Sequence, residues 1–413
     1  MQMSNNKYDV IIIGGGASGL MCASYLHFKA PFTKVLILER NNKLGAKVLV
    51  TGNGRCNLTN TSIVWSDYNT DSYDKLTEIL RVASVKDTMD FFENNLGLHL
   101  APKDDLIYPF SNKSSSVVDS FKFYLDNDAT TIKLQEKVTA VASKDDGYEV
   151  TTSAGAYATT NVVFAGGGCA APKTGSDGSI YKLLLNFARK SDFTQVVPSL
   201  VQLKTSETDT YSVAGTRVQA DLSLYSGTEY ICSSSGEMMF TDYGISGICV
   251  FCLSGEYNRA VLAGKKNMKV KAKLMPEHSL DEIKSLIDSR VKAFPERSMT
   301  EILMGFFTRE LSEIIVARSG NDVDAICKTI YEFTFTIKGS QGFDNAQVTS
   351  GGLNLDALTS SCELISKPGV YAIGELVNVD GPCGGYNLQW AWSSGMVAAS
   401  DIAAKVGESY GFN

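Results

Sequence analysis

Long apolar runs are missing from this sequence of 413 residues. No stretch of about 18 or more uninterrupted apolar residues occurs, so we expect no membrane-spanning helix and no membrane partner. A disulfide framework is not indicated either, because the nine cysteines are odd in number and scattered through a long chain. This cysteine usage predicts reduced thiols and a cytoplasmic location.

Basic residues are also fewer than acidic residues. The chain has 38 Lys and Arg against 45 Asp and Glu, which gives a formal net charge of -7. This balance argues against nucleic acid as a partner, while it leaves room for a local basic patch. Histidine is rare, with His27, His99 and His278 all outside the glycine-rich segments. No metal-ligand spacing or Ser-His-Asp arrangement emerges, so we expect no metal and a small-molecule substrate; the oligomeric state is left open.

A glycine-rich turn follows the first apolar run of the chain. The run Tyr8 to Ile13 is typical of a buried parallel strand, and Gly14-x-Gly16-x-x-Gly19 follows it and leads into a helical pattern. In such a turn the first glycine permits a tight bend, the second lets a pyrophosphate approach, and the third lets helix and strand pack closely. A second apolar run ends in Glu39, about 20 residues further on, where an acidic side chain can bind a ribose. These features together predict a dinucleotide-binding fold.

Two other segments place glycines directly after a strand. Residues 161–164 run into Ala165-Gly166-Gly167, and residues 369–373 run into Gly374-Glu375. Further on, Gly384-Gly385 opens a helical segment, whose positive end can face the flavin edge where negative charge builds on reduction. These elements indicate FAD rather than NAD as the resident dinucleotide.

The segment after Gly166 formally repeats the dinucleotide fingerprint as Gly166-x-Gly168-x-x-Ala171. Pro172 follows directly, and the next residues are typical of a turn, so no helix can begin where the fingerprint requires one. We therefore reject a second, NAD-binding Rossmann domain here. A transient encounter with NADH or NADPH is still compatible with the sequence.

Three longer motifs give the chain a specific family resemblance. They are Thr51-Gly-Asn-Gly-Arg-Cys-Asn-Leu-Thr-Asn60, Pro172-Lys-Thr-Gly-Ser176 and Gly381-Pro-Cys-Gly-Gly-Tyr-Asn-Leu-Gln-Trp-Ala391. With the other motifs they cover residues 8–400 and resemble the BaiN-like flavoproteins, also described as aminoacetone-oxidase-like. The resemblance implies noncovalent FAD in an α/β domain with two dinucleotide-binding folds, a Rossmann-like parallel sheet in three layers. This domain is interrupted by a β-barrel-like domain that carries a helical insertion.

The motifs and the resemblance together define the expected site. The cofactor-binding residues are expected to be Gly14, Gly16, Ala17, Ser18, Gly19, Glu39, Arg40, Lys47, Gly54, Arg55, Cys56, Asn57, Val138, Ala165, Gly166, Gly167, Gly374, Glu375, Asp380, Gly384, Gly385, Tyr386 and Asn387. Catalytic residues are not assigned, but Arg55, Asn57, Tyr386 and Asn387 are candidates for positions near the flavin ring. The hypothesis is hydride transfer at the flavin N5 atom. Tyr108-Pro-Phe110 is a further candidate, for a wall of the substrate cavity.

The middle of the chain fits the implied layout on its own terms. Residues 218–224 and 333–337 alternate apolar and polar side chains, as half-buried strands do. Between them, Ser279 with Glu282 and Ser298 with Glu301 form capping boxes, and residues 323–330 have helical spacing. The predicted boundaries are 1–195 with 345–413 for the FAD domain, 196–256 with 331–344 for the barrel, and 257–330 for the helical insertion.

The pair Cys249-x-x-Cys252 could be a redox dithiol. It lies in an apolar run, and we expect no helix N-terminus or basic neighbour there to lower a thiol pKa. Buried structural thiols are the favoured interpretation. Cys56 follows Arg55 and has a better electrostatic setting, but no resolving partner is evident.

The family resemblance implies two activities that the sequence does not separate. The first is reduction of an enone-like acceptor of the steroid or bile-acid type with NADH or NADPH as donor, and the second is oxidation of a small amino ketone such as aminoacetone. Flavin-dependent RNA modification and a non-catalytic flavin sensor are less favoured. Three positions depart from the family pattern: Asp242 where relatives often have His, Ile248 where they have Pro, and Cys383 where they have Thr.

Overall fold

The computed structural model describes residues 7–411, which form two compact units. The residues up to Val196 and those from Val348 onward make the first unit, and Val197–Gln347 make the second. No described helix is long and apolar enough to cross a membrane.

A seven-stranded sheet is the centre of the first unit. Its strands are β1 (Lys7–Ile13), β2 (Val35–Leu38), β7 (Thr130–Lys133), β8 (Val138–Lys144), β9 (Gly147–Thr152), β10 (Ala156–Phe164) and β19 (Val370–Ala372). The order is β7-β2-β1-β10-β9-β8, with β19 also paired to β10, and β7, β2, β1, β10 and β19 run parallel. Residues Val10–Ile13 are buried on both faces, as is all of β2, which explains their continuous apolar sequences. The predicted Rossmann-like parallel sheet is confirmed.

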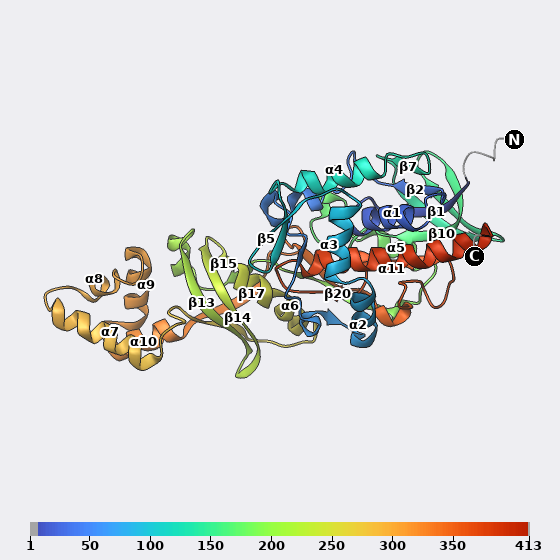
Figure 1. The fold of residues 1–413 in the computed structure, drawn as a ribbon. Coiled ribbons are helices and arrows are strands. Elements are labelled where there is room, and N and C mark those ends of the chain that lie inside the picture. The colour runs from blue at the N-terminus through green and yellow to red at the C-terminus, as the bar shows by residue number, and fades with distance from the viewer. Residues whose placement is uncertain (1–6, 412–413) are drawn as a thin grey trace. The chain divides into compact units, whose positions relative to one another are not determined.

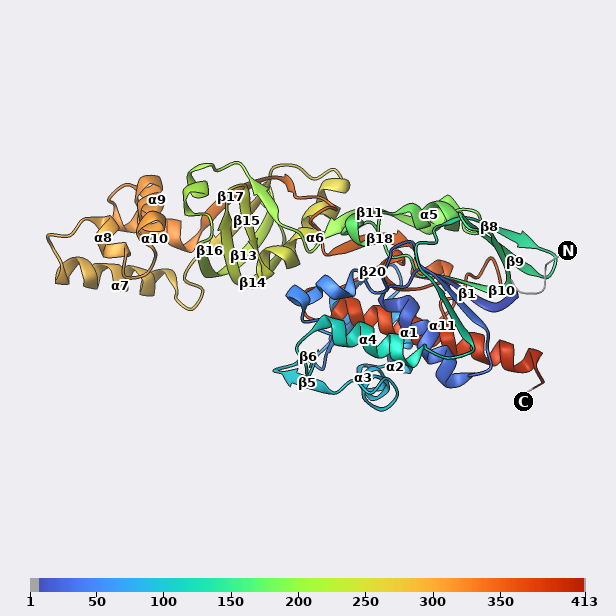
Figure 2. The same ribbon diagram turned by 90° about the horizontal axis from the view of Figure 1, so that it is seen from above.

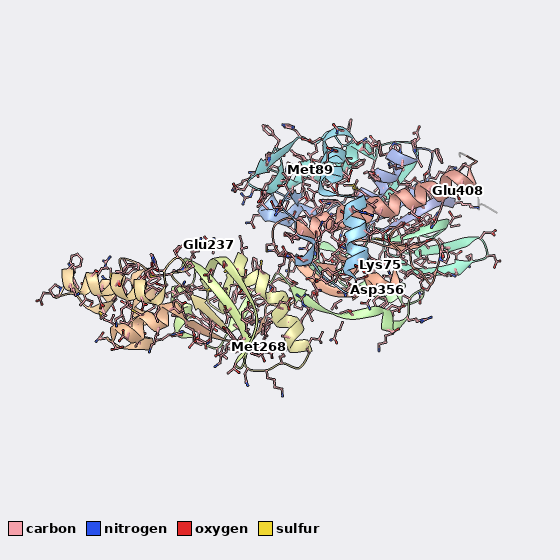
Figure 3. All side chains as sticks on the ribbon, turned by 60° about the horizontal axis from the view of Figure 1, so that its bottom comes forward. Lys75, Met89, Glu237, Met268, Asp356 and Glu408 are labelled. Carbon is pink, nitrogen blue, oxygen red and sulfur yellow. The ribbon has the colours of Figure 1, made fainter. Side chains whose placement is uncertain are left out.

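Helices and three small sheets complete this unit. The helices are α1 (Ala17–Lys29), α2 (Tyr73–Val82), α3 (Val85–Asn94), α4 (Ser114–Tyr124), α5 (Ser179–Leu184) and α11 (Tyr386–Ser409). The small sheets pair β3 (Thr59–Asn60) and β5 (Leu100–Lys103) with β6 (Leu106–Pro109), β4 (Asn69–Thr70) with β20 (Val379–Asp380), and β11 (Phe193–Ser199) with β18 (Val348–Leu353). Helices α1 and α11 lie side by side, although the sequence separates them by more than 350 residues (Figure 1). The ammonium group of Lys75, in α2, contacts Asp356, so two segments far apart in the sequence lie together (Figure 3).

A closed barrel forms the centre of the second unit. Its strands are β12 (Leu203–Thr205), β13 (Arg217–Ser226), β14 (Glu229–Thr241), β15 (Gly244–Gly247), β16 (Met268–Lys273) and β17 (Phe333–Ser340), in the order β12-β15-β14-β13-β16-β17. The helices are α6 (Ile248–Leu262), α7 (Leu280–Ala293), α8 (Met299–Leu303), α9 (Arg309–Ser319) and α10 (Val323–Tyr331). Helices α7 to α10 gather together beside β16 and β17 (Figure 2).

The local predictions for this unit are confirmed, with one correction. Both capping boxes begin helices, with Ser279 and Ser298 accepting from the N–H groups of Glu282 and Glu301. The helical insertion, however, does not span 257–330, because the barrel strand β16 lies inside that range. Its buried Met268, Val270 and Ala272 alternate with lysines as in a half-buried strand, but Lys and Ala are depleted in strands and weaken the prediction.

Candidate functional site

The ends of the parallel strands bring the expected site residues to one edge of the sheet. Ile13 pairs with both Leu38 and Phe164, and Phe164 pairs with Ala372. The residues that follow these four positions therefore come out at the same edge. They are Gly14, Glu39, Ala165 and Ile373, the last followed directly by Gly374. In open α/β sheets this carboxyl edge is where ligands bind.

The three glycines of the first turn have very different surroundings. A Cβ added to Gly14 would lie 2.5 Å from the carbonyl oxygen of Ala165, and one added to Gly19 would lie 2.1 Å from the carbonyl oxygen of Gly14. Gly14 also has a φ of +114°, which side chains rarely allow. An added Cβ on Gly16 would meet no atom within 4 Å. Protein packing explains Gly14 and Gly19, whereas Gly16 borders open space at the start of α1.

Glu39 is the acidic residue next to this turn. Its Oε2 accepts from the Gly15 N–H (2.8 Å) and its Oε1 accepts from the Asn41 N–H (2.7 Å). The residue is only 7% exposed, so the backbone fixes both oxygens. Each carboxylate oxygen can accept a second hydrogen bond, so the site keeps capacity for hydroxyl donors.

Arg40 connects the second strand to the turn after β10. Its guanidinium pairs with Asp177 (2.6 Å) and donates to Ser179 (3.3 Å). Burial by itself would raise the pKa of Asp177, but hydrogen bonds from Ser179 and Arg40 outweigh it and hold that pKa at about 2. Beside this pair, the hydroxyl of Ser176 is buried and, among residues 7–411, has no hydrogen-bond partner. It lies 2.8 Å from where a Cβ on Gly167 would be.

The turn after β10 does not begin a helix. Ala171 has a φ of +57°, Pro172–Thr174 form a single 3-10 turn, and α5 begins only at Ser179. The prediction that no dinucleotide helix starts after Gly168 is therefore confirmed.

Lys47 and Glu375 meet although 328 residues separate them. The Lys47 ammonium contacts Glu375 Oε2 at 2.6 Å, and Glu375 Oε1 accepts from the hydroxyl (2.9 Å) and the N–H (3.2 Å) of Thr349. The same hydroxyl of Thr349 accepts from the N–H groups of Cys169 and Ala170. Lys47 and Thr349 thus hold the Glu375 carboxylate directly, and residues 169–170 are linked to it through the Thr349 hydroxyl. Thr349 was not among the expected residues, and its buried strand V-T-S-G-G-L carries no motif that would have singled it out.

The loops 51–60 and 381–387 are joined by Asn57. Its amide, oriented so that donors meet acceptors, donates to the carbonyls of Thr59 (2.9 Å) and Ile107 (3.2 Å) and accepts from the Gly385 N–H (3.1 Å). A Cβ on Gly385 would lie 2.6 Å from the Thr59 backbone, and Gly385 has a φ of +92°. A glycine is required at position 385 because the start of α11 packs against β3.

Like Asn57, two more of the four candidates for the ring environment have hydrogen-bond partners within the protein. The Tyr386 hydroxyl donates to Asp67 (2.8 Å), and the Asn387 amide both accepts from the N–H of Gly381 and donates to its carbonyl. Tyr386 and Asn387 therefore hold their own loop in shape. Arg55 is exposed, with its Nε 3.4 Å from the carbonyl oxygen of Gly52.

The other expected residues are distributed as follows. Ser18 Oγ lies 2.4 Å from where a Cβ on Gly374 would be, so Ser18, in the first turn of the helix α1 that Ala17 begins, faces the turn at Gly374. Asp380 accepts from Asn69 (2.8 Å), and Gly54 and Gly384 have little around them. Val138 begins β8, two residues after Glu136, whose N–H donates to the Glu39 carbonyl.

Two of the cysteines singled out in the sequence, Cys56 and Cys249, are not activated thiols. Burial raises the pKa of Cys56 to about 11, against a smaller lowering by a hydrogen bond with Thr51. The expectation that no helix N-terminus lies near Cys249 is wrong, because α6 begins at Ile248 and places Cys249 in its first turn. Burial nevertheless raises the pKa of Cys249 to about 11, which outweighs its hydrogen bonds to backbone N–H groups.

The remaining candidates lie at or near the surface. His99 is 75% exposed and Phe110 is 70% exposed, whereas Tyr108 is partly buried and Pro109 is buried. His27 packs against the Tyr124 ring, and partial burial lowers the pKa of its imidazole. Among residues 7–411, no three His, Cys, Asp or Glu side chains are grouped so as to hold a metal ion.

Solved structures with a similar fold are those of oxidoreductases. The architecture is similar to that of 3-ketosteroid delta1-dehydrogenase from Sterolibacterium denitrificans, with a TM-score of 0.53 at 13% identity, covering 97% of this chain and 100% of the other. It is also similar to a quinol-fumarate reductase, with a TM-score of 0.52 at 13% identity, covering 98% of this chain and 72% of the other. At such identities the likeness concerns the fold alone.

The sequence narrows this class to a family. The chain belongs to the HI0933-like family, whose Rossmann domain profile matches residues 8–401. It is 33% identical to the 3-dehydro-bile acid delta(4,6)-reductase of Clostridium scindens, over 95% of this chain and 98% of the relative. It is 26% identical to the ribosomal RNA dihydrouridine synthase of Escherichia coli, over 96% of this chain and 98% of the relative. The BaiN-like resemblance is confirmed.

Proposed function

We propose that this protein binds FAD noncovalently in the cytoplasm and reduces a carbon–carbon double bond conjugated to a carbonyl group, with NADH or NADPH as electron donor. The observation that carries the proposal is the pair of relatives named above. Both are aligned over at least 95% of this chain, and both are named for adding hydrogen to a double bond.

The chain's own residues fit an FAD molecule at the sheet edge. The open space at Gly16, next to the first N–H groups of α1, suits a pyrophosphate. The free acceptor capacity of Glu39 suits ribose hydroxyls. Lys47 and Glu375 lie at the same edge, as a charged pair able to share its hydrogen bonds with a polar cofactor.

The two relatives' names share one chemistry. In a 3-oxo-4,6-diene steroid the double bonds are conjugated to a ketone, and in uracil the C5=C6 bond is conjugated to the C4 carbonyl. When bound, a flavin accepts a hydride from a nicotinamide and passes it to such an acceptor. In the overall reaction the nicotinamide loses two electrons and one hydrogen. The carbon β to the carbonyl gains the hydride, and the carbon α to it gains a proton from solvent.

The two loops that Asn57 joins would position the reacting groups. Asn57 joins loop 51–60 to the start of α11, and Asn387 holds the turn at Gly381, so both loops are fixed before any substrate binds. Neither Cys56 nor Cys249 is ionised near neutral pH, because burial raises the pKa of each to about 11. The chain is therefore better suited to direct hydride transfer than to dithiol chemistry.

The dihydrouridine synthases support RNA as a second candidate substrate. Two such relatives, from Escherichia coli and Haemophilus influenzae, are 26% and 27% identical over 96% and 95% of this chain. The acceptor would then be a uracil ring in RNA instead of a free small molecule, with the same bond reduced.

Reduction of the flavin by the nicotinamide donor is the step that tests this proposal. Anaerobic mixing of the purified yellow protein with NADH or NADPH is expected to bleach the flavin band near 450 nm, about as fast as turnover (typically 1–1000 per second). Aminoacetone in place of the nicotinamide is the matched control and should leave the band unchanged. Bleaching by aminoacetone alone, with peroxide formed on admission of air, would instead establish a small-amine oxidase.

A further inference from the structure

Three neighbouring strands of the barrel concentrate positive charge in this acidic chain. Strands β12, β17 and β16 are adjacent in the closed order and carry five lysines and no Asp or Glu. We call them the lysine strip: Lys204, Lys269, Lys271, Lys273 and Lys338. Strand β16, which begins at Met268 (Figure 3), contributes three of the five lysines by its sequence MKVKAK.

The alternation of the strands puts the whole strip on the outside of the barrel. Leu203, Val270, Ala272, Phe335 and Ile337 are buried in the barrel core, and the lysines occupy the positions between or next to them. The strand pairing then shows which residues are neighbours across the strip. Lys269 pairs with Thr336 and Lys271 with Thr334, while Lys204 pairs with Gly339, next to Lys338.

Few carboxylates balance this charge. Glu332 pairs with Lys271 at 2.7 Å, and both oxygens of Glu207 accept from the Thr336 N–H. Asp221 is opposite Lys273 on β13. Within residues 7–411, however, no ion pair involves Lys204, Lys269 or Lys338, and all three are exposed.

Aromatic rings and hydroxyls lie among the lysines. Tyr225 is opposite Lys269, with the Lys271 ammonium 5.0 Å from the centre of its ring. The Lys273 ammonium lies 5.0 Å from the ring of Tyr331, which is 41% exposed. Thr334 and Thr336 add hydroxyl donors between the cations. Surfaces that bind single-stranded or looped RNA combine these groups, with cations for the phosphates and rings for the bases.

We infer that the lysine strip is a docking surface for the phosphate backbone of RNA. This inference rests on the RNA form of the proposed function and adds a surface that would bind the polymer. Exposed lysines without an ion pair attract a polyanion through local charge complementarity. Such a surface can therefore bind RNA although the chain as a whole is acidic.

Fluorescence anisotropy with a labelled, uridine-containing RNA hairpin tests the docking surface. The holoprotein carrying Lys204→Gln, Lys269→Gln and Lys338→Gln is expected to bind the hairpin at least tenfold more weakly. The slope of its log–log salt dependence should fall by about 2–3, or ~0.7–0.9 for each phosphate that is no longer neutralised. The corresponding triple Lys→Arg variant should restore binding, because it keeps the charges.

The control variant removes the same charge elsewhere. Lys137, Lys182 and Lys292 are also exposed and, among the described residues, have no ion pair. The triple Gln variant at these positions should bind the hairpin within about twofold of the unsubstituted protein, and all variants should keep their melting temperature and flavin content. Equal binding by both triple Gln variants would overturn the assignment, as would binding to anionic phosphatidylglycerol vesicles but not to RNA.

The two proposals can fail separately. Strip-dependent RNA binding without any dihydrouridine formed in the presence of NADPH would keep the docking surface and reject RNA reduction. Bleaching and reoxidation by a small enone with no RNA binding would keep the reductase and reject the docking surface.

Discussion

Replacing Gly16 by Asp is expected to abolish flavin binding while leaving the folded protein as stable as before, or more so. Gly16 is the N-cap of α1, with extended backbone angles of −84° and −167°, and an added Cβ there meets no protein atom within 4 Å. Asp is among the best N-cap residues, and its charge is favourable at a helix N-terminus. The same carboxylate would occupy the space proposed for the pyrophosphate and would repel it.

The measurements are the flavin-to-protein ratio after purification, the Kd from an FAD titration, and the melting temperature of the apoprotein. We expect the Asp variant to lose at least about 100-fold in affinity, or ~2.7 kcal/mol. Gly16→Asn is the matched control, because it has nearly the same size and capping ability without the charge, and it should lose less. An Asp variant that is as yellow as the unsubstituted protein would contradict the position of the cofactor at this turn.

Replacing Gly19 by Val, three residues further on, is expected to have the opposite effect, a large loss of stability. Helix propensity by itself predicts a gain of a few tenths of a kcal/mol, because Val is a better helix residue than Gly. The contact geometry predicts a loss, because the new Cβ would lie 2.1 Å from the Gly14 carbonyl oxygen and 3.3 Å from the Ala165 Cβ. Helix α1 would have to move away from β1.

Thermal unfolding followed by circular dichroism decides between these two effects. Overpacking of this severity should cost about 3 kcal/mol or more, which corresponds to a fall of roughly 6–12 °C in Tm for a unit of this size. Gly339→Val is the control, since that glycine lies in a strand and has nothing within 4 Å of an added Cβ. A Gly19→Val protein that melts at the original temperature would contradict the close packing of helix and strand.

Much of the fold could be predicted because it follows from local sequence. The apolar run before Gly14 could only be buried on both faces, and the pairing of Ile13 with Leu38 and Phe164 then places the following residues together. The helix starts at Ser279 and Ser298 could also be predicted, since each capping box lies within four consecutive residues.

The errors and omissions have physical reasons as well. Strand β16 lies inside the range predicted for the helical insertion, although Met268, Val270 and Ala272 alternate with lysines, because the run is short and rich in Lys and Ala, which are depleted in strands. The start of α6 at Ile248 was missed because no polar capping side chain marks it; Gly247 is its N-cap. Contacts such as Thr349 with Glu375 join strands and turns through the tertiary fold, and no spacing in the sequence encodes them.

The candidate catalytic residues show the same limit. Loops 51–60 and 381–387 could be selected from their glycines, but the partner of each side chain could not. The hydroxyl of Tyr386 is bonded to Asp67, and the amide of Asn387 is bonded to Gly381. Both residues therefore stabilise the loop that carries them.

The most direct test of the proposed reduction is reoxidation of the reduced protein without oxygen. The flavin is first reduced anaerobically with one equivalent of dithionite, and a 3-oxo-4-ene steroid, a uridine-containing RNA hairpin or aminoacetone is then added. A matched steroid whose double bond is moved out of conjugation with the ketone is the control. We expect the yellow colour to return with a conjugated acceptor at least tenfold faster than with the unconjugated steroid. A flavin that stays reduced with the steroid and with the RNA, and turns yellow only when air is admitted afterwards, would contradict the reduction of a conjugated double bond.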